Sequence, residues 1–484
     1  MPSLEFCLPP EDASRLLRSG PLAKLPRPRP VTADQVWHDT ASGALEAEGM
    51  SLSEQRGAWR LQRMHPNAAL WPPGTPPPLL AEGQAPADLG RALPGPLIPV
   101  AAFKGRQRVI PLGPEAAGSL TLIEGMLRGI TQERPICRIV LDGPADQVEA
   151  LSSQLAGTAR LSVPRSTLAG EAIALARGHA IPPRREGAPE VASGTTLADA
   201  IAIVFSHLAD VILAGSATVA EGDSSEPVHR MRVAVRRLRS ALSVFHRAAD
   251  GPVPQHVKQA LRGLAGRLGT ARDWDVFLEG TGQTVAAAFP EDSRVAALLA
   301  AARRQRSIAY HDLARYLEGP EFRQLELGLV QLAALRPWQA AADEEHAAML
   351  AADAETFAGG LLHRRRSRML APGADIEDLP VNDLHAIRKE GKRLRYAAEF
   401  FALLFSRKLT RRFIDRLAEL QEELGHLNDG AAAGLLMARL PGGADRAYAT
   451  GIVAGFVAAH NQDSRRRISR AWGKFRKQEP FWSA

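Results

Sequence analysis

The sequence predicts an α+β protein of more than one domain, with a β-rich N-terminal domain followed by an all-α region. Three observations support this prediction. Short segments rich in β-forming residues dominate residues 1–180. From Leu197 to about Lys477, apolar residues recur with the 3.6-residue period of an α-helix. Within this helical part, one basic segment occurs twice at a separation of 156 residues.

The N-terminal domain is predicted over residues 1–180. Strands are expected at residues 4–8, 57–64, 105–112 and 136–143, and a short helix at residues 146–158. Residues 66–99 contain ten prolines among 34 residues, which indicates an exposed loop or linker. The change in composition after residue 180 places a linker at residues 181–195.

The helical part is predicted to form two bundles, over residues 196–345 and 346–484. Each half is long enough for about four helices, which suits one bundle per repeat. A stretch rich in Ala, Asp and Glu from Ala341 covers the junction.

The composition is that of a soluble globular chain. Hydrophobic residues make up 45% of the 484 residues and charged residues 23%. The two cysteines form no disulfide framework, and the N-terminus lacks the pattern of a secretory signal, so a cytoplasmic location is expected. The sequence offers no run of about 18 apolar residues, so no membrane span is expected.

The first basic segment, VHRMRVAVRRLRSALSVF, begins at Val228. One histidine and five arginines lie between His229 and Arg239, with no acidic residue among them. At about 100° per residue, His229, Arg232, Arg236 and Arg239 fall within about 80° of one another, while apolar residues such as Met231 occupy a neighbouring face. Like charges on one helix face are destabilising. The segment therefore predicts a helix whose basic stripe faces an anion.

The second basic segment, LHAIRKEGKRLRYAAEFF, begins at Leu384 and repeats the first. The same 156-residue offset also carries Gly269 onto Gly425 and Asp273 onto Asp429, which indicates a tandem duplication. For the two aspartates, orienting a nearby arginine or capping a helix is favoured over binding a metal ion. For the histidines at the start of each segment, proton uptake beside phosphate and hydrogen bonding at the helix end both stay open.

The repeated motifs, H-x-x-R-x-x-x-R-R-L-R and H-x-x-R-K-x-x-K-R-L-R-Y with their sequels LGTARDWDV and LGHLNDG, resemble the CHAD family (conserved histidine α-helical domain) over residues 195–478. The resemblance implies two four-helix bundles related by pseudo-twofold symmetry, whose basic helices line a groove or pore that binds inorganic polyphosphate. It assigns polyphosphate binding to the following residues: His229, Arg232, Arg236, Arg237, Arg239, His385, Arg388, Lys389, Lys392, Arg393 and Arg395.

The N-terminal domain resembles the CYTH family of triphosphate tunnel proteins, through residues 37–64, CRIVLDGPADQVEALSSQLA and VPRSTLAGEA. The resemblance implies an antiparallel β-barrel or tunnel. The family's E-x-E-x-K motif is reduced to Ser3, Glu5 and Cys7, and the L-R-x-R strand is replaced by residues 52–55. Thr167 stands where a lysine follows the late serine. A degenerate tunnel without triphosphatase activity, catalytic residues, bound metal or cofactor is therefore expected.

The predicted function is binding of inorganic polyphosphate, with targeting to polyphosphate granules and possible granule-associated protein partners. Two alternatives stay open: a metal-dependent triphosphatase in the N-terminal domain, and nucleic-acid binding by the basic helices. Nucleic acid is disfavoured as a partner because aromatic residues, which stack on bases in single-strand binders, make up only 5% of the chain.

Overall fold

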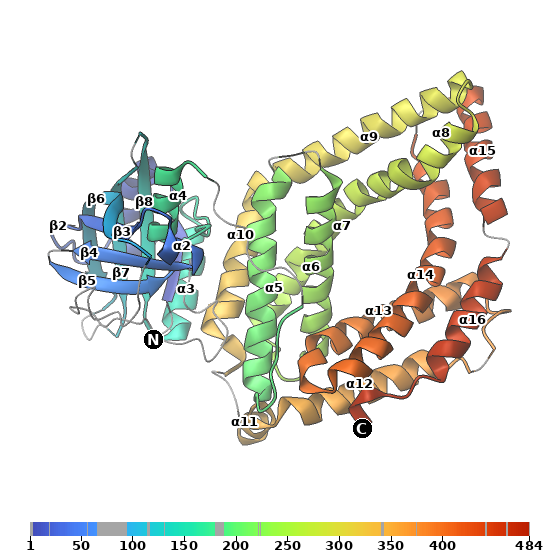
Figure 1. The fold of residues 1–484 in the computed structure, drawn as a ribbon. Helices are drawn as coiled ribbons and strands as arrows, with labels where there is room; N and C mark the ends of the chain where they lie inside the picture. Colours follow the sequence, from blue (N-terminus) through green and yellow to red (C-terminus); the bar gives the residue numbers. More distant parts are fainter. Residues whose placement is uncertain are drawn as a thin grey trace.

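The computed structural model has an N-terminal sheet domain and a larger helical part (Figure 1). It describes residues 3–18, 20–55, 57–64, 94–113, 117–129, 131–179, 188–220, 222, 224–339, 343–373, 375–440, 443–460 and 463–483. The predicted fold class, an antiparallel β domain followed by an all-α part, is confirmed. Residues 181–187 of the predicted linker lie outside the described residues.

The N-terminal sheet is antiparallel, and its main path runs in the order β1-β8-β7-β6-β3-β4-β5, with β2 paired to β6. The strands are β1 Ser3–Cys7, β2 Val31–Thr32, β3 Gln35–Thr40, β4 Met50–Gln55, β5 Ala58–Arg63, β6 Leu97–Pro111, β7 Ser119–Arg128 and β8 Glu133–Asp142. Since β1 and β5 end this path, the described strands form a curled, open sheet.

Alternation along β1 places Leu4 and Phe6 in the core between the sheet and α3 (Ala145–Ala156). The short α1 (Ala13–Arg18) closes one end of this core, and α4 (Leu168–Arg177) packs on β6 and β7. The predicted proline-rich loop is wrong at its end, because residues 97–99 already belong to β6, where Pro99 pairs with His38. Its remainder up to residue 93 lies outside the described residues.

The helical part begins with α5. Its helices are α5 Leu197–Ala220, α6 Ser225–Val244, α7 Pro252–Phe277, α8 Gln283–Ala288, α9 Ser293–Glu318, α10 Pro320–Val330, α11 Glu344–Ala351, α12 Ala354–Leu370, α13 Val381–Phe400, α14 Arg407–Ala438, α15 Ala444–His460 and α16 Ser464–Arg476. Aspartates begin several of them. Asp292, for example, accepts hydrogen bonds from the backbone of Arg294 and Val295 at 2.9 and 3.4 Å.

The duplicated segments occupy equivalent helices. Both α6 and α13 contain 20 residues, and they begin 156 residues apart, at Ser225 and Val381. Each packs against the long helix that follows it, α6 on α7 and α13 on α14. Leu238 and Leu394, which are equivalent in the repeat, are both fully buried. The helix pairs α6–α7 and α13–α14 therefore bury equivalent apolar faces.

The two halves of the helical part share one continuous apolar core. They meet where α6 contacts α13 and where α7 contacts α14. A third contact joins α15 to α9, where the guanidinium carbon of Arg294 lies 3.6 Å from the centre of the Tyr448 ring. Figure 1 shows these helices linked into a closed circuit.

The N-terminal domain is seated on α10 (Figure 1). Leu327 and Val330 of α10 enter the same apolar core as Phe6 and Leu155. Gln331 then donates hydrogen bonds of 3.0 Å to the hydroxyls of Ser152 and Ser153 on α3. The two domains are thus joined by a buried, mixed interface.

One described helix, α5, has the length and apolar composition of a membrane span. Of its most apolar window, 61% is buried within the protein, as in the core helix of a globular fold.

Candidate functional site

The two basic helices, α6 and α13, meet at a cluster of polar side chains to which both helices contribute. Arg236 of α6 donates a hydrogen bond to the hydroxyl of Tyr396 on α13, and its guanidinium carbon lies 5.6 Å from the centre of the Tyr396 ring. Arg237 lies at the same crossing, where it contacts Glu399 of α13. Tyr396 itself, almost fully buried, was not among the predicted site residues.

Glu399 of α13 joins two of the predicted cations. Its carboxylate accepts hydrogen bonds from Arg237 of α6 at 2.8 and 3.2 Å, and from Arg395 of its own helix at 3.0 Å. Arg395 also donates to the side-chain oxygen of Gln421 on α14 at 3.2 Å. Glu399 is therefore a shared counter-charge for these two arginines. The first basic segment contains no acidic residue and did not predict this pairing.

Arg232 and Arg388, equivalent in the repeat, each lie against a glycine of the following helix. A Cβ atom on Gly269 would come 3.1 Å from Nη1 of Arg232, and one on Gly425 would come 3.6 Å from Nη2 of Arg388. The glycines of the two L-G motifs therefore make room for arginines of the preceding basic helices. Arg232 also lies 3.6 Å from the carboxylate of Asp273.

Asp273 thus takes the arginine-orienting position that the sequence favoured over metal binding. The side chain of its counterpart Asp429 lies outside the described residues. Across the described part of the chain, no group of three or more His, Cys, Asp or Glu side chains is arranged to hold a metal ion.

His229 lies in a strongly cationic environment at the start of α6. Burial and the nearby Arg272, Arg236 and Arg232 lower the pKa of its imidazole, against the opposite effect of Glu226. Burial, Arg236 and Arg272 likewise lower the pKa of Arg232, with Asp273 opposing them. Glu279 pairs with Arg272 at 3.3 Å, and Asp273 lies 3.6 Å from Arg232, so carboxylates offset part of the positive charge gathered here.

Arg272 of α7 was not among the predicted site residues. It lies three residues after Gly269, which places it within about 60° of that glycine on the helix. Its position in the LGTARDWDV motif is the sequence signal that marks it, although the equivalent residue of the second repeat is Asn428.

Two other predicted residues of α13, Lys389 and Arg393, are exposed. Arg393 is ion-paired with Glu390 one turn earlier. Burial and the neighbouring Arg393, Arg368 and Arg364 lower the pKa of Arg365 on α12, with Glu390 opposing them. Arg393 therefore lies close to basic residues of α12.

The remaining predicted residues differ in exposure. Arg239 is exposed, whereas His385 and Lys392 are half-buried on α13. The Arg465–467 run that follows α15 has structural contacts, since Arg465 donates to the backbone oxygen of Leu379 at 3.0 Å and Arg467 pairs with Glu423 at 3.0 Å.

The N-terminal sheet holds its remaining signature carboxylate in an ion pair. Arg138 of β8 is fully buried and pairs with Glu5 of β1 and, at 2.9 Å, with Glu171 of α4. It also donates to the backbone oxygen of Ser166 at 3.1 Å. Burial raises the pKa of the Cys7 thiol to about 11. Glu5, the acidic residue left at the motif positions, thus belongs to an internal ion-pair network.

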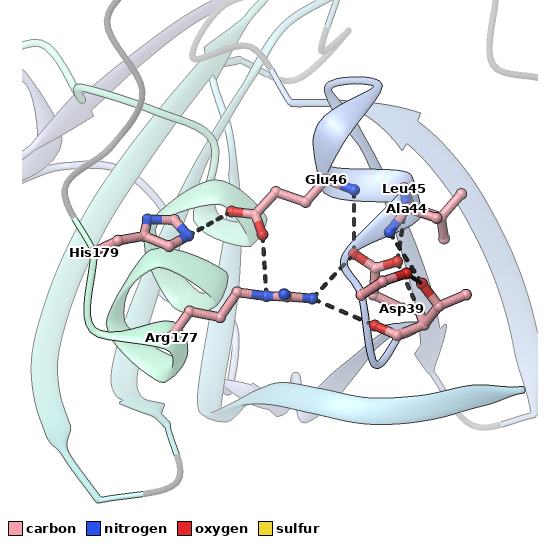
Figure 2. A network of polar contacts seen from close by, with 8 residues as sticks. Asp39, Ala44, Leu45, Glu46, Arg177 and His179 are labelled. Atoms are coloured by element: carbon pink, nitrogen blue, oxygen red, sulfur yellow. Dashed lines mark hydrogen bonds and ion pairs between the residues drawn. The ribbon is translucent and has the colours of Figure 1, made fainter. Parts of the chain in front are cut away.

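A second network in this domain is also internally satisfied. Figure 2 shows Asp39 accepting hydrogen bonds from the backbone of Leu45 at 2.9 Å and Glu46 at 3.1 Å, at the start of the short α2 (Ala44–Ala47). Glu46 in turn pairs with Arg177 at 3.0 Å and His179 at 2.9 Å. These contacts tie the end of α4 to the β3–β4 connection.

The geometry defines the class of protein. It is a helical domain in which two repeated helix hairpins, α6–α7 and α13–α14, meet through their basic helices. The model of the CHAD domain matches residues 202–438, and this region is a CHAD domain. The chain is similar to the crystal structure of the CHAD domain from the plant Ricinus communis, with 28% identity and a TM-score of 0.51, over 60% of this chain and 97% of that one.

A weaker likeness joins the chain to PptA from Streptomyces chartreusis, with 17% identity and a TM-score of 0.42, over 57% of this chain and 99% of that one. A comparison with curated proteins gave no match.

Proposed function

We propose that the CHAD domain of this protein binds inorganic polyphosphate at the paired basic helices α6 and α13. The observation that carries the proposal is the crowding of Arg232, Arg236, Arg272 and His229 in one partly buried place, where the arginines depress the pKa of His229. Inorganic polyphosphate carries negative charge along its whole length, so a bound chain would reduce the repulsion between these cationic side chains.

Two groups of residues would contribute differently. His229, Arg232, Arg236, Arg388 and Lys392 form the proposed primary contact set, because they follow the basic stripes of α6 and α13 at steps of three or four residues. Arg237, Arg393 and Arg395 would have to exchange a carboxylate for phosphate. Arg239, His385 and Lys389 would extend the surface on either side.

The nucleic-acid alternative gains no support from the aromatic residues of the site. Tyr396 is 4% exposed, while Phe400 and Phe401 are fully buried, so none of these rings can stack on a base. Competition between long polyphosphate and single-stranded DNA at physiological salt would separate the two ligands. The triphosphatase alternative is similarly unsupported, because Arg138 engages Glu5.

Polyphosphate binding would carry the protein to polyphosphate granules, where the N-terminal domain could present a surface to other granule proteins. Fluorescence microscopy of a tagged chain in cells with and without polyphosphate would test this localisation.

The direct test is a calorimetric titration with polyphosphate of defined length. Arg236→Gln should weaken binding about tenfold or more, since one charge-assisted hydrogen bond contributes about 1.5–3 kcal/mol. Arg393→Gln, which removes a cation already paired with Glu390, should weaken it less. Both variants should keep the helical circular dichroism of the wild type. Wild-type affinity in Arg236→Gln would refute the proposed site.

A further inference from the structure

The first three turns of α14 carry a basic surface separate from the α6–α13 crossing. Arg407, Lys408, Arg411, Arg412 and Arg416 line a shallow hollow of about 640 Å³, together with two carboxylates. The first four of these cations are exposed. We propose that this surface, the α14 patch, is a second polyphosphate contact that engages the part of a long chain extending beyond the paired basic helices. The inference rests on the proposed function.

The carboxylates of the hollow are already engaged. Asp415 lies 3.9 Å from Arg411, and Glu419 pairs with Arg416 at 2.9 Å and with Lys474 at 2.6 Å. The side chains of Arg407, Lys408 and Arg412 make no hydrogen bond or ion pair with any other residue that the structure describes. The patch therefore has a surplus of positive charge at its N-terminal end.

This surplus opposes the stability of its own helix. The beginning of an α-helix carries partial positive charge, so cations there cost about 0.3–1 kcal/mol each at low ionic strength. No acidic residue stands in the first turn of α14, whereas Asp292, Asp343 and Asp353 begin α9, α11 and α12 in the usual way. A bound polyanion would turn this unfavourable arrangement into a favourable one.

The first repeat shows that the fold does not need these cations. The equivalent positions in and just before α7 are all uncharged or weakly basic: Gly251, Pro252, Gln255, His256 and Ala260. One apolar position between them is used in the same way in both copies, since Val257 and its counterpart Phe413 are both fully buried. The repeat thus keeps its packing while only the second copy carries the patch.

One edge of the patch lies on the side of α14 that faces the basic stripe of α13. Lys408, Arg412 and Arg416 lie about 100–180° further round the helix. Arg407 precedes Gly425 by five full turns, so at about 100° per residue it takes the same angular position, and Arg411 falls within about 40° of it. Gly425 faces Arg388. A chain lying along Arg388 and Lys392 would reach Arg407 after about 27 Å, at 1.5 Å per residue of α14.

Polyphosphate fits the patch better than a nucleic acid does. Phe413, the aromatic residue of these turns, is fully buried, so the patch offers charge without a surface for base stacking. The long, flexible arginine and lysine side chains can contact phosphate groups wherever these fall along a bound polyphosphate chain.

The test compares long-chain polyphosphate with tripolyphosphate on the full chain. The patch variant combines Arg407→Gln, Lys408→Gln, Arg411→Gln and Arg412→Gln, which keep helix propensity. It should bind the long chain about tenfold or more weakly, with the slope of log affinity against log salt reduced by about 3 for four lost contacts, by analogy with single strands. Its tripolyphosphate affinity should match that of the wild type.

A control variant with the same loss of charge combines Lys24→Gln, Arg29→Gln, Arg303→Gln and Arg304→Gln, all at exposed sites. It should retain long-chain affinity. If the patch variant also retains it while Arg236→Gln does not, the α14 patch is refuted and the proposed function stands. If the wild type binds neither ligand, the proposed function itself fails. Single-stranded DNA binding lost only in the patch variant would assign the patch to nucleic acid.

Discussion

At the scale of single residues, most arginines of the site already have a carboxylate neighbour: Asp273 lies 3.6 Å from Arg232, and Glu390 pairs with Arg393. Glu399 is the carboxylate that spans the two basic helices, through Arg237 and Arg395. A phosphate chain arriving at the crossing would compete with it for the same guanidinium groups. Glu399 therefore acts as an internal counter-anion, whose removal has opposite effects on stability and on binding.

Glu399→Gln should raise the affinity for polyphosphate severalfold and lower the thermal midpoint by a few degrees. The affinity rises because two arginines lose their competing charge, and stability falls because a half-buried ion pair between helices is broken. Titration calorimetry and scanning calorimetry measure the two effects. Glu390→Gln, which removes a pair within one helix, should leave the midpoint unchanged. A fall in affinity for Glu399→Gln would instead show that Glu399 holds the two arginines in position.

His229 offers a spectroscopic test of the same cluster. In the free protein the arginines and burial hold the pKa of His229 below 6.5, so the folded state disfavours its protonation, and stability is lost as pH falls from about 6.5. Bound polyphosphate should raise this pKa, because its charges favour the imidazolium. An NMR pH titration with and without tripolyphosphate measures the change. His179, paired with Glu46 in the N-terminal domain, serves as the control signal. No change at His229 would place the ligand elsewhere.

At the scale of elements, the site is built from hairpins in which a glycine on one helix admits an arginine from the other. The basic stripes, their helical character and the repeat were all predictable from periodicity. The partner of each arginine was not, because the choice between Glu399, Tyr396 and phosphate depends on the angle at which α6 crosses α13. Local sequence patterns do not encode that angle.

Gly269→Leu tests the hairpin geometry. The added side chain must displace the Arg232 guanidinium, since the Cβ atom alone would lie 3.1 Å from it. Polyphosphate affinity should fall about three- to tenfold, which corresponds to roughly 0.7–1.4 kcal/mol. Gly266→Leu is the matched control, because a Cβ atom at that position meets no atom within 4 Å. Both variants gain helix propensity of about 0.8 kcal/mol. Equal affinities in the two variants would contradict a role for the Arg232 position.

At the scale of the whole molecule, the main unpredicted feature is the seat of the N-terminal domain on α10. Only β1, β5, β8 and part of β6 were located from β-forming residues. The sheet order also brings β6 beside β3 and β8 beside β1. Such pairings join residues far apart in sequence, so local propensity cannot select them. The hydrogen bond between Gln331 and Ser152 likewise forms only where the two folded domains pack together, so local sequence patterns cannot predict it.

Glu326 of α10 makes this interface sensitive to pH. It lines two cavities between the domains, and burial raises its pKa to about 8, against the opposing Arg323 and Arg165. Because its unfolded-state pKa is near 4.5, the folded state holds a proton that the unfolded state releases. This group therefore makes stability fall as pH rises from about 4.5 to about 8.

Glu326→Gln should abolish that slope, since glutamine mimics the protonated acid at every pH. The wild type should lose stability relative to the variant between pH 5 and pH 8, as measured by the thermal midpoint at a series of pH values. Glu321→Gln, on the exposed side of the same helix, is the control and should keep the wild-type profile. Parallel profiles for wild type and Glu326→Gln would show that Glu326 is solvated and ionised, and that the interface between the domains opens to water at this residue.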